Sequence, residues 1–377
     1  MSSLTLQLDA ERFLSGYWQK RALLIRDPWG SWSNPLDPDE LAGLACEDEV
    51  ESRLVTGAYP ELKVEHGPFA ETRFAGLGRE PWTLLVQAVD HHVPSVAALL
   101  RAFRFIPNWR VDDVMVSYAA DGAGVGPHFD QYDVFLIQGL GKRRWRVGAM
   151  CDSSTPLLPH EDLRLLQSFE ATGEYVLEPG DVLYLPPGIA HEGVAVGDDC
   201  MTYSVGFRAP SRSELIEGWS RHLLSELQED DRYSDPDLEP QDNPGEIAPE
   251  AMARLHSMTM EKLLDRDSFA RWFGRHSTEP KYPDMDWRPE QPMDPEELRQ
   301  RLATGAPLSR NPASRFSFVR SGSDCVLLFV DGECFECTGG AAAFAEQLCA
   351  QDQVSADGSA TALIAALIDR GSIAFED

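Results

Sequence analysis

The stretch that decides the fold is Gly126–Gly148, GPHFDQYDVFLIQGLGKRRWRVG, which is rich in β-branched and aromatic residues. It predicts strands over Asp133–Gln138 and Arg143–Val147 with a turn at Gly139–Lys142 between them. Residues two apart on a strand point to the same side, so His128 and Asp130 direct an imidazole and a carboxylate toward one point.

A second stretch, Glu178–Gly193 (EPGDVLYLPPGIAHEG), places His191 after an apolar strand and a Pro-Pro-Gly turn. An adjacent strand in a barrel can bring His191 opposite His128 and Asp130. Two histidines and one carboxylate on one face of a metal leave about three positions open, as in non-haem iron(II) oxygenases. Zinc is the alternative metal, and a pair of satisfied core histidines is the alternative without a metal.

Arg143 shares the strand face of Trp145 and Val147, which should point into the barrel. A buried cation needs a buried anion. We therefore expect Arg143 to bind the distal carboxylate of an organic acid held beside the metal. The alternative is a salt bridge to a carboxylate of the protein itself.

Short strands with Gly and Pro turns continue on both sides of these stretches and predict an antiparallel barrel or sandwich over about 111–208. The other strands expected there are Val114–Tyr118, Glu174–Leu177, Asp181–Leu185 and Thr202–Arg208. The first ~105 residues have a mixed pattern with helical spacing in four places. These are Asp9–Gln19, Pro38–Ala45, Pro81–Val89 and Pro94–Phe103.

After the barrel, helices are expected over 211–228 and Pro249–Phe273, with an acidic, proline-bearing connection between them. A C-terminal unit follows, with a helix capped by Asp294, strands that include a hairpin at Asp331-Gly332, and further helices, in the manner of a winged helix. From Met285 to Asp377 there are seven Lys and Arg residues against fifteen Asp and Glu. That charge disfavours DNA as a partner of the unit.

The bulk composition narrows the class of protein. The 377 residues contain no apolar run of the ~18–20 residues that a membrane span needs and no secretory signal, so cytoplasm is the expected location. Seven cysteines spread over a long chain suit reduced thiols. A net charge of −29 opposes nucleic-acid binding and would attract a basic partner, although solubility alone could explain it.

At Gly126–Gly148 and Glu178–Gly193 the chain resembles the JmjC-type oxygenases of the double-stranded β-helix (cupin) fold. The resemblance is to the bacterial ribosomal oxygenases, which hydroxylate an arginine of the sixteenth large-subunit ribosomal protein. It implies a mainly β protein with appended helices (α+β). The expected domains are a JmjC domain over 1–210, a helical dimerisation region over 211–280 and a winged-helix-like domain over 281–377.

The resemblance also implies roles for single residues. His128, Asp130 and His191 become iron(II) ligands, Arg143 binds 2-oxoglutarate, and Asp121 receives the substrate arginine, although Asp121 could equally cap its own loop beside Gly122. Ser117, on a strand that should line the same pocket, is a weaker candidate for binding 2-oxoglutarate. Tyr118 and Ser204 are weaker candidates for substrate contact. Dioxygen is the second cosubstrate, and the enzyme is expected to be a homodimer.

Three alternatives stay open at this point. The same oxygenase chemistry could act on a histidine or lysine of another protein, the barrel could bind a metal without oxidation, or the C-terminal unit could regulate transcription on DNA.

Overall fold

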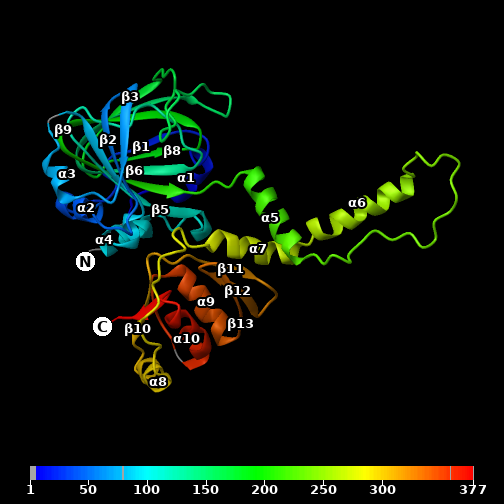
Figure 1. Cartoon of the computed structure of the whole chain (residues 1–377). Coiled ribbons are helices and arrows are strands. Elements are labelled where there is room, and N and C mark those ends of the chain that lie inside the picture. Colours follow the sequence, from blue (N-terminus) through cyan, green and yellow to red (C-terminus); the bar gives the residue numbers. More distant parts are fainter. Residues whose placement is uncertain (1–5, 79, 357, 377) are drawn as a thin grey trace. The chain divides into compact units, whose positions relative to one another are not determined.

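A computed structural model describes residues 6–78, 80–356 and 358–376. The chain divides into two compact units, Met1–Ala209 with Asn311–Ala313, and Pro210–Arg310 with Ser314–Asp377. Figure 1 shows the first unit in blue to green and the second in green to red. Among the described residues no helix is both long and apolar enough to cross a membrane.

The first unit is built on one large antiparallel sheet, in the order β1-β8-β6-β9-β5-β4-β2-β3, with β7 paired to β6. Its strands are β1 Leu23–Ile25, β2 Ser52–Ala58, β3 Glu61–His66, β4 Trp82–Val86, β5 Val111–Ala119, β6 Asp133–Met150, β7 Gly173–Leu177, β8 Val182–Leu185 and β9 Ile189–Phe207. The mainly β, cupin-like fold is therefore confirmed. The sheet also takes in four strands that precede residue 111, outside the barrel core expected at 111–208.

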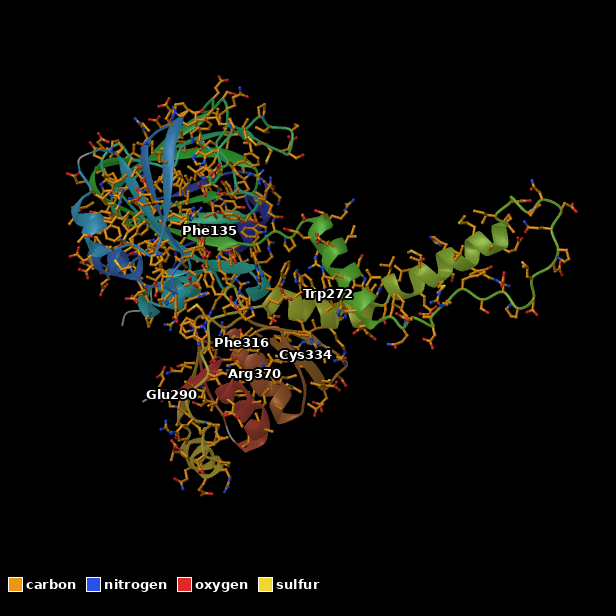
Figure 2. All side chains as sticks on the ribbon, in the orientation of Figure 1. Phe135, Trp272, Glu290, Phe316, Cys334 and Arg370 are labelled. Carbon is orange, nitrogen blue, oxygen red and sulfur yellow. The ribbon has the colours of Figure 1, made fainter. Side chains whose placement is uncertain are left out.

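Successive side chains of β6 point to opposite faces of this sheet and show what each face contacts. Phe135 and Ile137 pack with Tyr184 and Phe207 against the N-terminal helices (Figure 2 labels Phe135). Val134 and Leu136 face the opposite side, where they pack with Trp145 and other apolar residues. A strand with apolar residues at both parities is buried on both faces. One face of the sheet is thus a core and the other forms the wall of a cavity.

The helices of this unit are short. They are α1 Ala10–Gly16, α2 Pro38–Leu44, α3 Glu71–Ala75, η1 Val89–His91, α4 Pro94–Ala97, η2 Ala98–Phe103 and η3 Asn108–Arg110. α2 begins with a full capping box between Asp37 and Glu40, followed by Pro38 at the first turn. Residues Pro81–Val89, expected as a helix, instead contain strand β4, which pairs with β2 on one side and β5 on the other.

The second unit consists of helices and two small sheets, β14-β10-β15 and β11-β12-β13. The helices are α5 Arg212–Glu226, α6 Pro249–Leu263, α7 Arg266–Thr278, α8 Pro295–Ala303, α9 Gly340–Ala350, η4 Gly358–Ala360 and α10 Thr361–Asp369. The strands are β10 Pro307–Arg310, β11 Phe316–Arg320, β12 Cys325–Val330, β13 Glu333–Thr338, β14 Gln353–Ser355 and β15 Ile373–Phe375. The expected hairpin is present, since β12 and β13 pair across Asp331-Gly332, both at positive φ.

Apolar side chains inside the second unit explain its packing. Trp219 and Leu223 of α5 pack on Trp272 of α7, labelled in Figure 2. α7 also lies on the β11–β13 sheet, where Gly274 meets Phe329. None of the side chains of α6 is buried.

Candidate metal centre

Three metal-ligand side chains meet at one point of the large sheet. His128, Asp130 and His191 place one ligand atom each within 4.8 Å of one another. Backbone pairing brings them together, because the His128 N–H donates to the His191 carbonyl at 3.0 Å and the His191 N–H donates back at 2.8 Å. The turn before His191 is fixed by a bond from the Gly188 N–H to the Asp130 carbonyl at 2.6 Å.

Both imidazoles are aimed by the same local contact. Nδ1 of His128 lies 2.9 Å from the Gly126 carbonyl, and Nδ1 of His191 lies 2.9 Å from the Ile189 carbonyl. A carbonyl oxygen can only accept, so each Nδ1 carries the proton and each Nε2 offers its lone pair to the centre. The Oδ2 atom of Asp130 lies 3.9 Å from Nε2 of His128 and 3.5 Å from Nε2 of His191.

These distances fit one metal ion. Two donors that each lie ~2.1 Å from a shared ion are at most ~4.2 Å apart, and both His–Asp distances fall inside that limit. His191 is 3% exposed. Burial, helped by the nearby His128, lowers the pKa of His191 to about 4, although Asp130 opposes the shift. The imidazole is therefore neutral near pH 7, which is the form that ligates a metal.

A cavity of about 320 Å³ opens over this centre. Its walls include apolar side chains of β5 and β6 and a few polar groups, among them Ser117, Tyr132, Arg143 and Ser204. A mostly apolar pocket with a few convergent polar groups is typical of a small-molecule site. Arg53 and Thr83, from β2 and β4, also line it, so the N-terminal strands contribute to the wall.

Arg143 is the buried cation of this cavity. It is 4% exposed, as its strand parity predicted, and its guanidinium lies 5.8 Å from the centre of the Trp145 ring. Its Nη2 atom is buried without a hydrogen-bond partner. Within the residues that the structure describes, no carboxylate pairs with Arg143, so the salt bridge to the protein itself is not formed. The orphaned nitrogen fits an incoming carboxylate.

Two of the other candidate residues line the cavity and two do not. Ser117 and Ser204 are part of its wall. Asp121 lies outside the lining and accepts a hydrogen bond from the Gly197 N–H at 2.7 Å. Tyr118 is also outside, and its hydroxyl donates to Asp199 at 2.6 Å. Burial and that hydrogen bond to Asp199 raise the pKa of Tyr118 above its ordinary value.

The sequence alone does not indicate the buried groups that contact Arg143. Its Nε–H donates to the Sγ atom of Cys200 at 3.4 Å, and Gln138 donates to the same sulfur at 3.6 Å. All of these side chains come from β6 and β9. No short motif signals the contact, because it depends on the register of two long strands.

Comparisons with known proteins agree with this architecture. The JmjC domain family matches residues 98–215, the ROXA-like winged helix family matches 259–373, and the AraC-like ligand binding domain family matches 167–273. The chain is 43% identical over 328 residues to the "Ribosomal protein uL16 3-hydroxylase" of Escherichia coli, covering 87% of this chain and 86% of that protein. It is 38% identical over 283 residues to the "Probable ribosomal oxygenase" of Haemophilus influenzae, covering 71% and 67%.

Solved structures extend the similarity to the whole fold. The X-ray structure of E. coli ycfD superposes with a TM-score of 0.89 at 40% identity and covers 99% of both chains. The structure of YcfD, described as a ribosomal oxygenase, in complex with cobalt and 2-oxoglutarate gives a TM-score of 0.85 at 39% identity, again over 99% of both. The chain belongs to the bacterial JmjC-domain ribosomal oxygenases.

Proposed function

We propose that this protein is an iron(II)- and 2-oxoglutarate-dependent dioxygenase that hydroxylates an arginine side chain of a large-subunit ribosomal protein. One observation carries the proposal: a buried, unpaired arginine nitrogen lies in the same cavity as a two-histidine, one-carboxylate cluster. The E. coli relative is a uL16 3-hydroxylase by name. Iron(II) with 2-oxoglutarate and dioxygen, when bound, supplies the oxidation of a carbon–hydrogen bond that no amino-acid side chain can oxidise.

The chain's own residues position the reactants. His128, Asp130 and His191 are the proposed metal ligands, with each imidazole fixed through its Nδ1–H. Arg143 pairs with the distal carboxylate of 2-oxoglutarate, and the Ser117 hydroxyl lies on the same cavity wall. The apolar wall formed by Val134, Leu136 and their neighbours excludes water from the reacting atoms.

The substrate contacts are proposed in two places. Ser204 contacts the substrate side chain or the cosubstrate inside the cavity. Asp121 and Tyr118 act outside the lining, where the Asp121 carboxylate would accept a guanidinium as it now accepts the Gly197 N–H. Asp121→Asn should then raise KM for the protein substrate and leave KM for 2-oxoglutarate unchanged.

The remaining partners follow from charge and from exposed apolar surface. A net charge of −29 suits the capture of a basic ribosomal protein and disfavours nucleic acid. All seven cysteines are free thiols, which suits the cytoplasm, the proposed location. Ile216 and Leu224 of α5 are 59% and 71% exposed, and we assign this face to a homodimer interface.

Intact-mass spectrometry of purified ribosomal proteins tests the function. Each protein is incubated with the enzyme, iron(II), 2-oxoglutarate and air, beside a His128→Ala control. The expected result is a gain of ~16 Da on one protein, absent from the control and mapped to an arginine, since one oxygen atom is inserted.

Two other results would change the conclusion. Mapping to histidine or lysine keeps the chemistry and replaces the substrate. If iron-loaded enzyme neither adds mass to any protein nor consumes 2-oxoglutarate, the barrel is a non-oxidative metal-binding cupin and the proposal is wrong.

A further inference from the structure

A buried thiol contacts the guanidinium of Arg143. The Arg143 Nε–H donates to Sγ of Cys200 at 3.4 Å, and the aromatic face of Trp145 lies 5.8 Å from the guanidinium carbon. The hydrogen bond to Cys200 orients the Nε edge of the guanidinium, and the contact with Trp145 restrains the plane of the guanidinium. The Nη2 end is left buried and without a partner.

Cys200 is itself held by a second layer of hydrogen bonds. Gln138 donates from Nε2 to the Cys200 sulfur at 3.6 Å and to the Leu140 carbonyl at 2.7 Å. The Thr202 hydroxyl donates to Oε1 of Gln138 at 3.1 Å, which fixes which end of the amide faces the sulfur. Cys200, Gln138 and Thr202 are almost completely inaccessible to water.

The strand register explains why these groups meet. Gln138 on β6 pairs with Thr202 on β9, the register then shifts on either side of Leu140, and regular pairing resumes at Lys142 opposite Val196. Gly141, at φ +58, lies within this stretch. Arg143 pairs with Ala195, which packs in one cluster with Cys200, so the pairing of β6 and β9 brings the side chain of Arg143 beside the thiol.

A thiol beside Arg143 differs from a carboxylate in its effect on the charge of the guanidinium. Sulfur is a weak, uncharged acceptor, so it can orient the Nε–H without neutralising the guanidinium. An aspartate or glutamate at the same place would form an ion pair and compete with an incoming carboxylate. Fixing a side chain before the ligand arrives reduces the entropy lost on binding.

We propose that Cys200, supported by Gln138 and Thr202, is a positioning residue that holds Arg143 in the orientation needed to bind the distal carboxylate of 2-oxoglutarate. This inference rests on the proposed function. It adds a role for a buried thiol that is neither one of the proposed metal ligands nor itself part of the cavity lining.

Calorimetric binding of 2-oxoglutarate to the manganese(II)-loaded full chain tests the proposal without turnover. Cys200→Ala removes the acceptor, Cys200→Ser keeps one, and Cys349→Ala is the control because it removes a buried thiol from the other unit. We expect Cys200→Ala to weaken the 2-oxoglutarate Kd roughly threefold to tenfold, the range of an ordinary net hydrogen bond, because sulfur is a weak acceptor. Cys200→Ser and Cys349→Ala should stay within about twofold of the parent chain.

Steady-state kinetics give a second readout that a purely structural role would not produce. Cys200→Ala should raise KM for 2-oxoglutarate by the same factor, while kcat, the manganese(II) Kd and KM for the protein substrate stay close to those of the parent chain. Thr202→Val, which is nearly isosteric, should weaken 2-oxoglutarate binding in the same direction by a smaller factor. It keeps the proposal testable if Cys200→Ala does not fold.

Several results would overturn the proposal. One is an unchanged Kd for 2-oxoglutarate in Cys200→Ala. Another is an equal loss of 2-oxoglutarate affinity in Cys200→Ala and Cys200→Ser, because packing rather than hydrogen bonding would then be the cause. If Cys200→Ala does not fold, an unchanged Kd for 2-oxoglutarate in Thr202→Val would also overturn the proposal. A parent chain that binds manganese(II) but no 2-oxoglutarate would instead refute the proposed function, and this inference with it.

Discussion

The chemistry of the metal centre is prepared by hydrogen bonds between a side chain and a backbone carbonyl only two residues away. His128 bonds Gly126 and His191 bonds Ile189, so each imidazole is oriented by the carbonyl two residues before it. The sequence could predict the cluster because the spacing of His128 and Asp130 is local, although both lie outside the named strands. Cys200 could not be predicted, since its contact with Arg143 depends on how two strands pair across 57 positions.

Removing His191, the most buried of the three proposed ligands, should strongly weaken metal binding. His191→Ala deletes one of three donors and leaves a void beside Trp145, whose ring centre lies 5.9 Å from that of His191. We expect iron(II) or manganese(II) affinity to fall at least ~100-fold, measured by calorimetry on the metal-free protein. His256→Ala is the matched control, because His256 is exposed on α6 of the second unit. Equal affinity in both variants would exclude His191 as a ligand.

A second prediction at this scale concerns pH and the buried carboxyl of Asp331. Burial raises the pKa of Asp331, although it accepts hydrogen bonds from the Arg315 N–H at 2.9 Å and the Ser372 hydroxyl at 2.8 Å. A carboxyl whose pKa is higher in the folded state takes up a proton on folding, so its contribution to stability is largest at low pH and is lost as pH rises through the folded pKa.

Asp331→Asn tests that sign, since Asn-Gly suits the same hairpin turn. The free energy of unfolding of the parent chain, minus that of the variant, should grow as pH falls from 7 toward 4.5 in urea titrations of the full chain. Asp324→Asn makes the same substitution at an exposed position before β12 and should give a smaller change. A difference that shrinks with falling pH would contradict the prediction.

At the scale of whole elements, helices with caps were predicted well, as was the short buried strand β8, but β4 was not. α2 and α8 begin at Pro38 and Pro295 as their capping residues indicated. β4, with the sequence WTLLV, was expected as a helix because a short apolar run has no decisive period. The expected turn at Gly139–Lys142 was also wrong, since β6 continues through it as an irregular strand. In both cases pairing with distant strands decides the structure.

Replacing each of two helical glycines by alanine tests how closely their helices pack against neighbouring elements. A Cβ at Gly274 of α7 would lie 2.3 Å from the Phe329 ring on β12, so Gly274→Ala should lower the free energy of unfolding by about 1–3 kcal/mol. A Cβ at Gly43 of α2 meets no atom within 4 Å, and Gly43→Ala should raise it by about 0.5–1 kcal/mol. Scanning calorimetry of both variants measures the two shifts, and a stabilised Gly274→Ala would show that α7 does not pack on this sheet.

At the scale of the whole molecule, the first unit contains the cavity, whose lining residues lie between Arg53 and Ser204 in the sequence. The second unit has exposed apolar side chains on its helices. Trp219 and Leu223 of α5 are used internally against Trp272, whereas Ile216 and Leu224 are not covered. None of the side chains of α6 is buried either, so apolar surface on α5 and α6 is left uncovered by the residues that the structure describes. A second copy is the occupant proposed above.

Leu224→Glu should therefore disrupt the proposed dimer. In a twofold interface each substitution occurs twice, so losing the burial of a leucine at ~1.5–3 kcal/mol per copy would weaken association at least ~100-fold. Sedimentation equilibrium over a range of concentrations measures this, with Ser225→Glu as the control that adds the same charge at the neighbouring exposed position. A monomeric parent chain would refute the dimer, and a dimeric Leu224→Glu would move the interface off α5. Consumption of 2-oxoglutarate per subunit should stay unchanged in the monomer, because every residue lining the cavity belongs to the first unit.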